Sequence, residues 1–153
     1  MVAIHTAGRY PELVRSLVAA GCSTQPGARS AGLYARLIGW SDRAGEAPVR
    51  RLLGEEGAAA FLRQGRADLT VVSAAVRAVA RFDLLADLAR VDAPVTVLNG
   101  RLDQFRGQER RFAAAAPQGR LVVLGYGTHM VNLTHPDAYT DTLERLLQDA
   151  EAR

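Results

Sequence analysis

The sequence predicts an α/β protein, with about three parallel strands, flanking helices and a small helical insertion. Three short apolar runs rich in β-branched residues alternate with stretches of helical periodicity, and such alternation is typical of a parallel sheet covered by helices. The apolar runs end at Gly21, Gly100 and Gly125. The chain has 153 residues and 48% hydrophobic content, enough for one ordinary core, so residues 1–153 are expected to form a single domain.

The N-terminal part is predicted to contain a helix, a strand and then the insertion. The helix over residues 1–8 should end before Pro11, because proline disfavours helical dihedrals in the preceding residue. The run LVRSLVAAG, residues 13–21, predicts a short buried strand over 13–20. Residues 23–68 contain short helical pieces (AGLYARLIGW, PVRRLLG and EEGAAAFLRQG) interrupted by Gly and Pro, which favours a helical insertion over another layer of the sheet.

The remainder of the chain alternates helix and strand. Leu69, Val72, Val76 and Val79 recur at helical spacing and predict an amphipathic helix. Two further strands are predicted, over VTVLNG (95–100) and RLVVL (120–124). The expected helices cover residues 69–80, 82–90 and 107–116, and a last one begins near Pro136.

Composition excludes several classes of function. All 19 basic residues are Arg, and they are scattered among 16 acids, a pattern typical of solvated helix faces and not of a nucleic-acid-binding stripe. Cys22 is the only cysteine, which rules out an internal disulfide and a zinc cluster of cysteines. No apolar run approaches the roughly 20 residues that span a bilayer, and no secretory signal is recognisable. We therefore expect a cytoplasmic protein that binds neither nucleic acid nor membrane and uses no metal or cofactor.

An acid and a histidine follow two of the predicted strands. Asp103 stands three residues after Gly100, and His129 stands four residues after Gly125. A lone Asp after a strand is more often a turn or capping residue, and a lone loop His is more often a surface residue. At the carboxyl ends of neighbouring parallel strands, however, the two would meet. A carboxylate that accepts from one imidazole nitrogen leaves the other nitrogen basic, so the pair is a candidate general base and its orienting acid.

These residues carry a family resemblance. The segments VDAPVTVLNGRLDQF and RRFAAAAPQGRLVVLGYGTHMVNLTHPDAYTDTL resemble the C-terminal part of α/β-hydrolase-fold proteins, where an acid follows the penultimate strand in a G-x-x-D turn and a histidine follows the last strand. The resemblance implies that Asp103 is the acid and His129 the base of a catalytic triad. The segment IHTAGRYPELVRSLVAAG resembles the helix after the family's nucleophile and the strand that follows it, and residues 23–68 lie where the family inserts its cap.

The chain departs from the family pattern at several positions. Thr128 and Gln104 stand where Gly and Pro are common, which is tolerable. More important, no segment reads G-x-S-x-G, so the resemblance implies that a Ser, Asp or Cys nucleophile and the oxyanion hole lie upstream. Cys22 and Ser23 follow the first strand and could in principle replace the nucleophile. We disfavour them, because cysteine is commonly buried and Ser23 has ordinary turn surroundings.

Two hypotheses of function follow. The first is an α/β hydrolase of an ester, lactone, amide or similar bond in a small-molecule substrate, of which this chain supplies His129 and Asp103. The alternative is a non-catalytic truncated remnant or interaction subunit of the same fold. A dinucleotide site at LVVLGYGTHM is rejected, because Met130 occupies the place of the third small residue. The three histidines have no metal-ligand spacing, and His135 before Pro136 is expected to cap a helix.

The missing upstream half also has a consequence for the surface. In the resembled fold the strand over 13–20 is paired on both sides, so here one edge should be unpaired. Leu17 and Val18, and the helix face of Val2 and Ile4, should then lose their cover. An apolar edge strand is a template for another chain. We expect self-association, poor solubility or a partner that carries the complementary half.

Overall fold

A computed structural model describes residues 1–25, 27, 32–33, 36, 45–63 and 69–152. The chain divides into two compact units. The first comprises Met1–Gln25 with Asp83–Arg153, and the second is Pro26–Phe82. The side-chain oxygen of Gln25 accepts a hydrogen bond from the backbone N–H of Leu84 at 3.0 Å, so the chain leaves the first unit and re-enters it at adjacent points.

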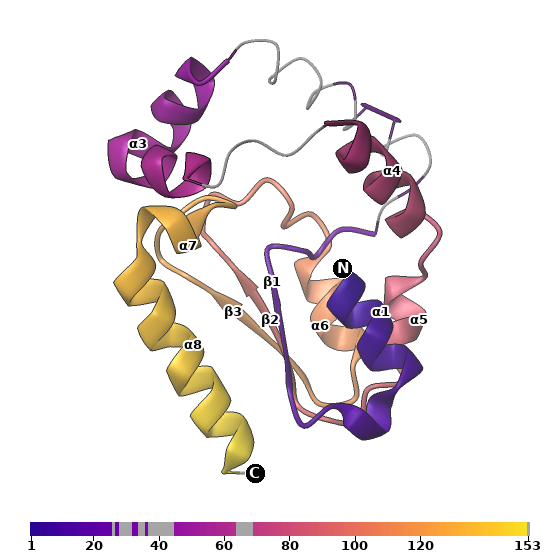
Figure 1. Cartoon of the computed structure of the whole chain (residues 1–153). Helices are drawn as coiled ribbons and strands as arrows, with labels where there is room; N and C mark the ends of the chain where they lie inside the picture. Colours follow the sequence, from indigo (N-terminus) through magenta and orange to yellow (C-terminus); the bar gives the residue numbers. More distant parts are fainter. Residues whose placement is uncertain (26, 28–31, 34–35, 37–44, 64–68, 153) are drawn as a thin grey trace. The chain divides into compact units, whose positions relative to one another are not determined.

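The first unit is built on a three-stranded parallel sheet in the order β1-β2-β3 (Figure 1). In the register, Ala20, Leu98 and Val122 lie side by side near the carboxyl ends of their strands. The loops that follow therefore all start from the same end of the sheet. This is the predicted α/β arrangement, confirmed with its three parallel strands. The strands are β1 (Leu17–Ala20), β2 (Val95–Asn99) and β3 (Gly119–Val123).

Helices cover both faces of this sheet. In Figure 1, α1, α5 and α6 lie on one side of the strands and α8 lies on the other. All five residues of β2 are buried between these layers, as expected for the central strand of a parallel sheet. On the α8 side, Leu98, Leu124, Val131 and Leu146 form one apolar cluster. The helical elements of the unit are α1 (Val2–Arg9), the 3-10 turn η1 (Pro11–Leu13), α5 (Leu84–Leu88), α6 (Glu109–Ala115), α7 (Val131–Thr134) and α8 (Pro136–Glu151).

Helix α1 is clamped to α5 by a buried carboxylate. Asp87 is only 2% exposed, and its Oδ2 lies 2.8 Å from Nδ1 of His5. Arg90 binds the same carboxylate and donates from Nε to the carbonyl of Gly8 at 3.0 Å. A Cβ on Gly8 would lie 2.6 Å from Asp87, so the two helices touch at a glycine. This packing buries Ile4 to 1% exposure, and the prediction that Ile4 loses its cover is therefore wrong.

The first strand is shorter than predicted. It begins at Leu17, because Pro11 opens a 3-10 turn in which the N–H of Val14 donates to the Pro11 carbonyl at 3.1 Å. Proline's fixed φ suits the first turn of a helix, and this local preference prevailed over the apolar pattern. Leu13 is consequently 76% exposed. Within the described part of the chain, β1 pairs with β2 alone and is an edge strand.

The second unit contains α3 (Ala47–Leu62) and α4 (Leu69–Val79). Gly54, with φ 71° and ψ 177°, interrupts α3. The interruption falls at the boundary that the sequence predicted between PVRRLLG and EEGAAAFLRQG. The predicted piece AGLYARLIGW lies mostly outside the described residues, and the cap role of residues 23–68 stays a prediction. In neither unit do the described residues include a helix long and apolar enough to cross a membrane.

Candidate active site

The loops after the three strands converge at the carboxyl end of the sheet. The N–H of Gly21 donates to the Leu98 carbonyl at 2.9 Å, which carries the pairing one residue past β1. The loops after β2 and β3 are joined in the same way, since Leu102 donates to the Gly127 carbonyl at 2.9 Å. Residues from all three loops are thereby held within reach of one another.

Asp103 is held in the loop after β2 with its carboxylate turned inward. Its side chain is 1% exposed, and its N–H closes a turn on the Gly100 carbonyl at 3.1 Å. One carboxylate oxygen, Oδ1, accepts from the N–H of Phe105 at 2.7 Å. The other, Oδ2, lies 3.3 Å from Nδ1 of His129. The structure thus brings together the acid and the histidine that the sequence singled out.

His129 lies between this carboxylate and an aromatic ring. Phe105 packs against it in a T-shaped arrangement, with ring centroids 4.7 Å apart and planes at 71°. The imidazole side chain is 32% exposed, whereas its carboxylate partner is enclosed. A proton on Nδ1, facing Asp103, leaves the lone pair of Nε2 available to accept a proton. The arrangement therefore suits a general base.

Two glycines allow this close approach, and the sequence identified them only as the ends of strands. A Cβ on Gly21 would lie 2.9 Å from Nδ1 of His129 and 3.3 Å from Oδ2 of Asp103, and its φ of +60° also favours glycine. A Cβ on Gly100 would lie 2.7 Å from the carbonyl oxygens of Gly127 and Thr128. Any side chain at either position would push the loops apart.

Ser23 and Cys22, the two substitute nucleophiles, are poorly placed for that role. Ser23 is 1% exposed, and its hydroxyl donates to the Phe105 carbonyl at 3.2 Å. Cys22 is half-buried, and burial raises the pKa of its thiol. The positive charge of the Met1 α-amino group lowers the pKa of this thiol, but more weakly than burial raises it. A raised thiol pKa means less of the reactive thiolate at neutral pH.

The other two histidines belong to different surroundings. His5 is part of the α1–α5 clamp. His135 is the N-cap residue of α8, as predicted, although its side chain makes no capping hydrogen bond. Its Nδ1 instead lies 2.9 Å from Oγ1 of Thr134, and its ring lies against Tyr126. The residues that the structure describes contain no group of three or more His, Cys, Asp or Glu side chains arranged to hold a metal ion.

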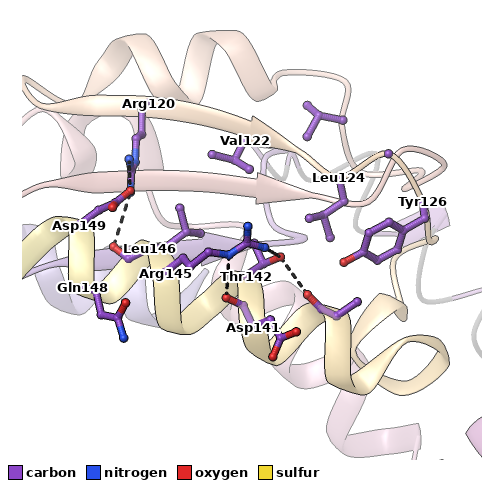
Figure 2. A pocket seen from close by; sticks show the side chains of 13 residues that line it. Arg120, Val122, Leu124, Tyr126, Asp141, Thr142, Arg145, Leu146, Gln148 and Asp149 are labelled. Atoms are coloured by element: carbon purple, nitrogen blue, oxygen red, sulfur yellow. Dashed lines mark hydrogen bonds and ion pairs between the residues drawn. The ribbon is translucent and has the colours of Figure 1, made fainter.

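A groove of about 670 Å³ runs between β3 and α8, and its lining includes neither Asp103 nor His129. Its arginines are engaged by neighbouring groups (Figure 2). Arg120 reaches Asp149 at 3.1 Å, and Arg145 donates to the Asp141 carbonyl. Arg120 also donates to Oγ1 of Thr96 at 2.9 Å. The groove is therefore a separate feature from the Asp103–His129 pair.

Curated proteins similar in sequence include enzymes of two kinds. Polyketide synthase ThaQ of Burkholderia thailandensis is 29% identical over 160 residues, a match that covers 99% of this chain and 8% of the synthase. RutD of Pseudomonas savastanoi, named as a carbamate hydrolase, is 37% identical over 70 residues, covering 44% of this chain and 27% of RutD. RutD of Agrobacterium fabrum is 35% identical over 90 residues, covering 58% and 33%. No protein-family model matches the chain.

Solved structures of several hydrolases superpose on nearly the whole chain. A thermophilic esterase from Thermogutta terrifontis gives a TM-score of 0.74 at 22% identity, covering 97% of this chain and 61% of the esterase. E-2-(acetamidomethylene)succinate hydrolase gives 0.73 at 18% identity, with 95% and 62% covered. A hydrolase from Pseudomonas aeruginosa gives 0.73 at 22%, with 95% and 60% covered. The chain has part of the α/β-hydrolase fold.

The matches cover only part of the length of each similar protein. The chain spans a third or less of the curated relatives described above and about 60% of the length of the superposed hydrolases. Identities near 20% establish the α/β-hydrolase fold alone. Within that fold, the described sheet consists of three strands, with β1 at one edge and β3 at the other.

Replacing Gly21 by Ala should destabilise the first unit. The new methyl group would meet the His129 ring, and the positive φ would be strained, so we expect a loss of about 1–3 kcal/mol in the free energy of unfolding. Urea denaturation followed by circular dichroism measures it. Gly125→Ala is the matched control, because a Cβ there meets no atom within 4 Å, and it should change stability by less than about 0.5 kcal/mol. Equal effects of both substitutions would contradict the proposed contact.

Proposed function

We propose that the chain is the part of an α/β hydrolase that carries the general base, His129, and its orienting acid, Asp103. The observation that carries the proposal is the 3.3 Å approach of Asp103 Oδ2 to His129 Nδ1, at the carboxyl ends of neighbouring parallel strands. Ligands of open α/β sheets bind at this edge. The reaction is hydrolysis of an ester, lactone, amide or similar bond in a small molecule.

Asp103 is enclosed whereas His129 is partly exposed, and this difference assigns a role in proton transfer to each. Asp103 is enclosed and fixed by the Phe105 N–H, so it can hold one imidazole nitrogen and stabilise the imidazolium that forms. Nε2 of His129 would take the proton of a Ser or Cys nucleophile as that nucleophile attacks the carbonyl carbon. The same nitrogen would then return the proton to the departing group. The similarity to RutD supports a carbonyl substrate, since carbamates and esters share this attack.

The nucleophile is proposed to come from sequence that precedes Met1. The start of α1 and the carboxyl end of β1 lie at the same end of the sheet (Figure 1). Helix α1 therefore begins at the same edge of the sheet as Asp103 and His129. A strand and turn joined to the start of α1 would deliver their last residues to this edge, as a G-x-S-x-G elbow requires.

A second candidate function is an interaction subunit without turnover. The observation that favours it is the edge position of β1 within the described sheet, together with the exposed side chains of Val2 (62%) and Leu13 (76%). The coding sequence upstream of Met1 separates the two. An in-frame segment that ends in G-x-S-x-G supports the hydrolase, and its absence from the gene supports the interaction subunit.

If the upstream segment exists, His129→Ala in the extended polypeptide should lower kcat/KM for an activated ester by about 10²–10⁴-fold, the usual contribution of a general base. Release of p-nitrophenol from p-nitrophenyl acetate gives the rate. His135→Gln is the matched control, because His135 bonds Thr134 and not Asp103 or His129, and it should leave the rate unchanged. An unchanged rate in His129→Ala would sink the assignment.

The chain of 153 residues alone should hydrolyse activated esters no faster than background. It contains no G-x-S-x-G segment, and loss of one oxyanion-hole donor already costs about 10²–10³ in rate. The assay is the same p-nitrophenol release, with heat-denatured chain as the blank. Turnover above the blank would contradict this expectation, and its loss in Cys22→Ala would restore a nucleophile within the chain.

The edge of β1 should make the chain self-associate. Backbone N–H and C=O groups on an unpaired edge are a template for another strand, and Val2 and Leu13 add exposed apolar surface. Size-exclusion chromatography with light scattering, over a range of protein concentrations, should show species larger than the monomer. Leu13→Glu tests the added surface and should shift the distribution toward monomer. A monodisperse monomer at high concentration would argue against an open edge.

A further inference from the structure

Phe105 contacts both members of the candidate pair. Its backbone N–H donates to Oδ1 of Asp103 at 2.7 Å, and its ring packs edge-on against the imidazole of His129 at 4.7 Å between centroids. The position of this one residue therefore affects the direction of the carboxylate and the tilt of the imidazole together.

Phe105 belongs to no helix or strand, so other contacts must fix its backbone. Two hydroxyl groups from the loop after β1 do so. Oγ1 of Thr24 donates to the Phe105 carbonyl at 2.8 Å, and Oγ of Ser23 donates to the same oxygen at 3.2 Å. Phe105 is thus held on both sides of its Cα, by the carboxylate at its N–H and by two hydroxyls at its carbonyl.

The Ser23 hydroxyl is itself held by a buried polar network. The side-chain amide of Asn99, 1% exposed, donates to Oγ of Ser23 and to Oε2 of Glu109, each at 3.0 Å. Arg106, the neighbour of Phe105, binds both carboxylate oxygens of Glu109 at 2.8 and 2.9 Å. The network ties the end of β2, the start of α6 and the loop after β1 to the segment that contains Phe105.

We propose that Ser23 and Thr24 are positioning residues, which set the geometry of the His129–Asp103 pair through the Phe105 carbonyl. The inference rests on the proposed function, because the geometry matters for a general base. The loop after β1 would then keep the Nδ1–H of His129 directed at the carboxylate of Asp103. In this role the Ser23 hydroxyl is occupied as a donor and acts through Phe105 without touching the substrate.

The tautomer of His129 tests this without any need for turnover. In the ¹⁵N-labelled chain, at about pH 9 where the neutral ring prevails, imidazole ¹⁵N–¹H correlation spectra give the ratio of Nδ1–H to Nε2–H forms. The double variant Ser23→Ala/Thr24→Val should lower this ratio for His129 roughly 2- to 10-fold, the equivalent of losing about one hydrogen bond. Asp103→Ala should remove the Nδ1–H preference altogether.

Two controls separate positioning from general loss of structure. His5 faces a carboxylate through Nδ1 in the same spectrum, and its ratio should not change in the double variant. Thr142→Val removes another buried hydroxyl, which donates to Ala138 in α8, and should leave His129 as in the parent chain. Urea denaturation establishes that each variant is folded, and Thr24→Val alone serves if the double variant is not.

The possible results are distinct. A parent-like ratio in the Ser23→Ala/Thr24→Val chain, with the Nδ1–H preference lost in Asp103→Ala, overturns the positioning role and leaves the pair intact. A ratio that Asp103→Ala does not change overturns the pair, and with it both proposals. The positioning role stands if the ratio falls for His129 in the double variant while His5 and the Thr142→Val chain stay unchanged.

Discussion

The candidate site depends on three parallel strands that end together and on the absence of side chains where their loops cross. Gly21 lies against the His129 ring, and Gly100 lies against the backbone of the His129 loop. Parallel pairing brings the loops to one edge, but only glycine lets them approach to the distance at which Asp103 reaches the imidazole. The pair is therefore a product of backbone geometry first and of side-chain chemistry second.

The enclosed polar groups around the pair carry a cost that the surrounding bonds must offset. Burying an amide, a hydroxyl or a carboxylate is unfavourable unless each finds a partner. Ser23, Asn99 and Asp103 are almost fully buried, and each is hydrogen-bonded. Among the described residues, no buried side-chain nitrogen or oxygen lacks a partner. A polar network of this kind specifies one loop arrangement where an apolar filling would allow several.

The sequence predicted the parts of the fold that depend on local pattern. The strands β2 and β3 are predicted correctly because apolar runs bounded by Pro and Gly have few alternatives. Asp103 and His129 were found because both follow such a run. Phe105 was missed, since nothing in its neighbours reveals that its carbonyl is held by hydroxyls some 80 positions earlier in the chain.

Where the sequence prediction was wrong, one local preference or one tertiary contact decided the outcome. The turn at Pro11 shortened the first strand, although the run LVRSLVAAG has the composition of a longer one. Ile4 is predicted to lie on an exposed face. Instead, His5 of α1 pairs with Asp87 of α5, and the contact between the two helices buries Ile4. Neither effect follows from periodicity, because one comes from a single residue's dihedral preference and the other from a partner distant in sequence.

The hydrogen bond between Gln25 and Leu84 joins the two points at which the chain leaves and re-enters the first unit. Since the chain departs and returns at neighbouring points, the sheet and its loops need not adjust when the intervening segment changes in length. The entropy of closing a loop grows only with the logarithm of its length, so a longer or shorter segment costs little. The segment can therefore vary in length while the end of the sheet that carries Asp103 and His129 stays unchanged.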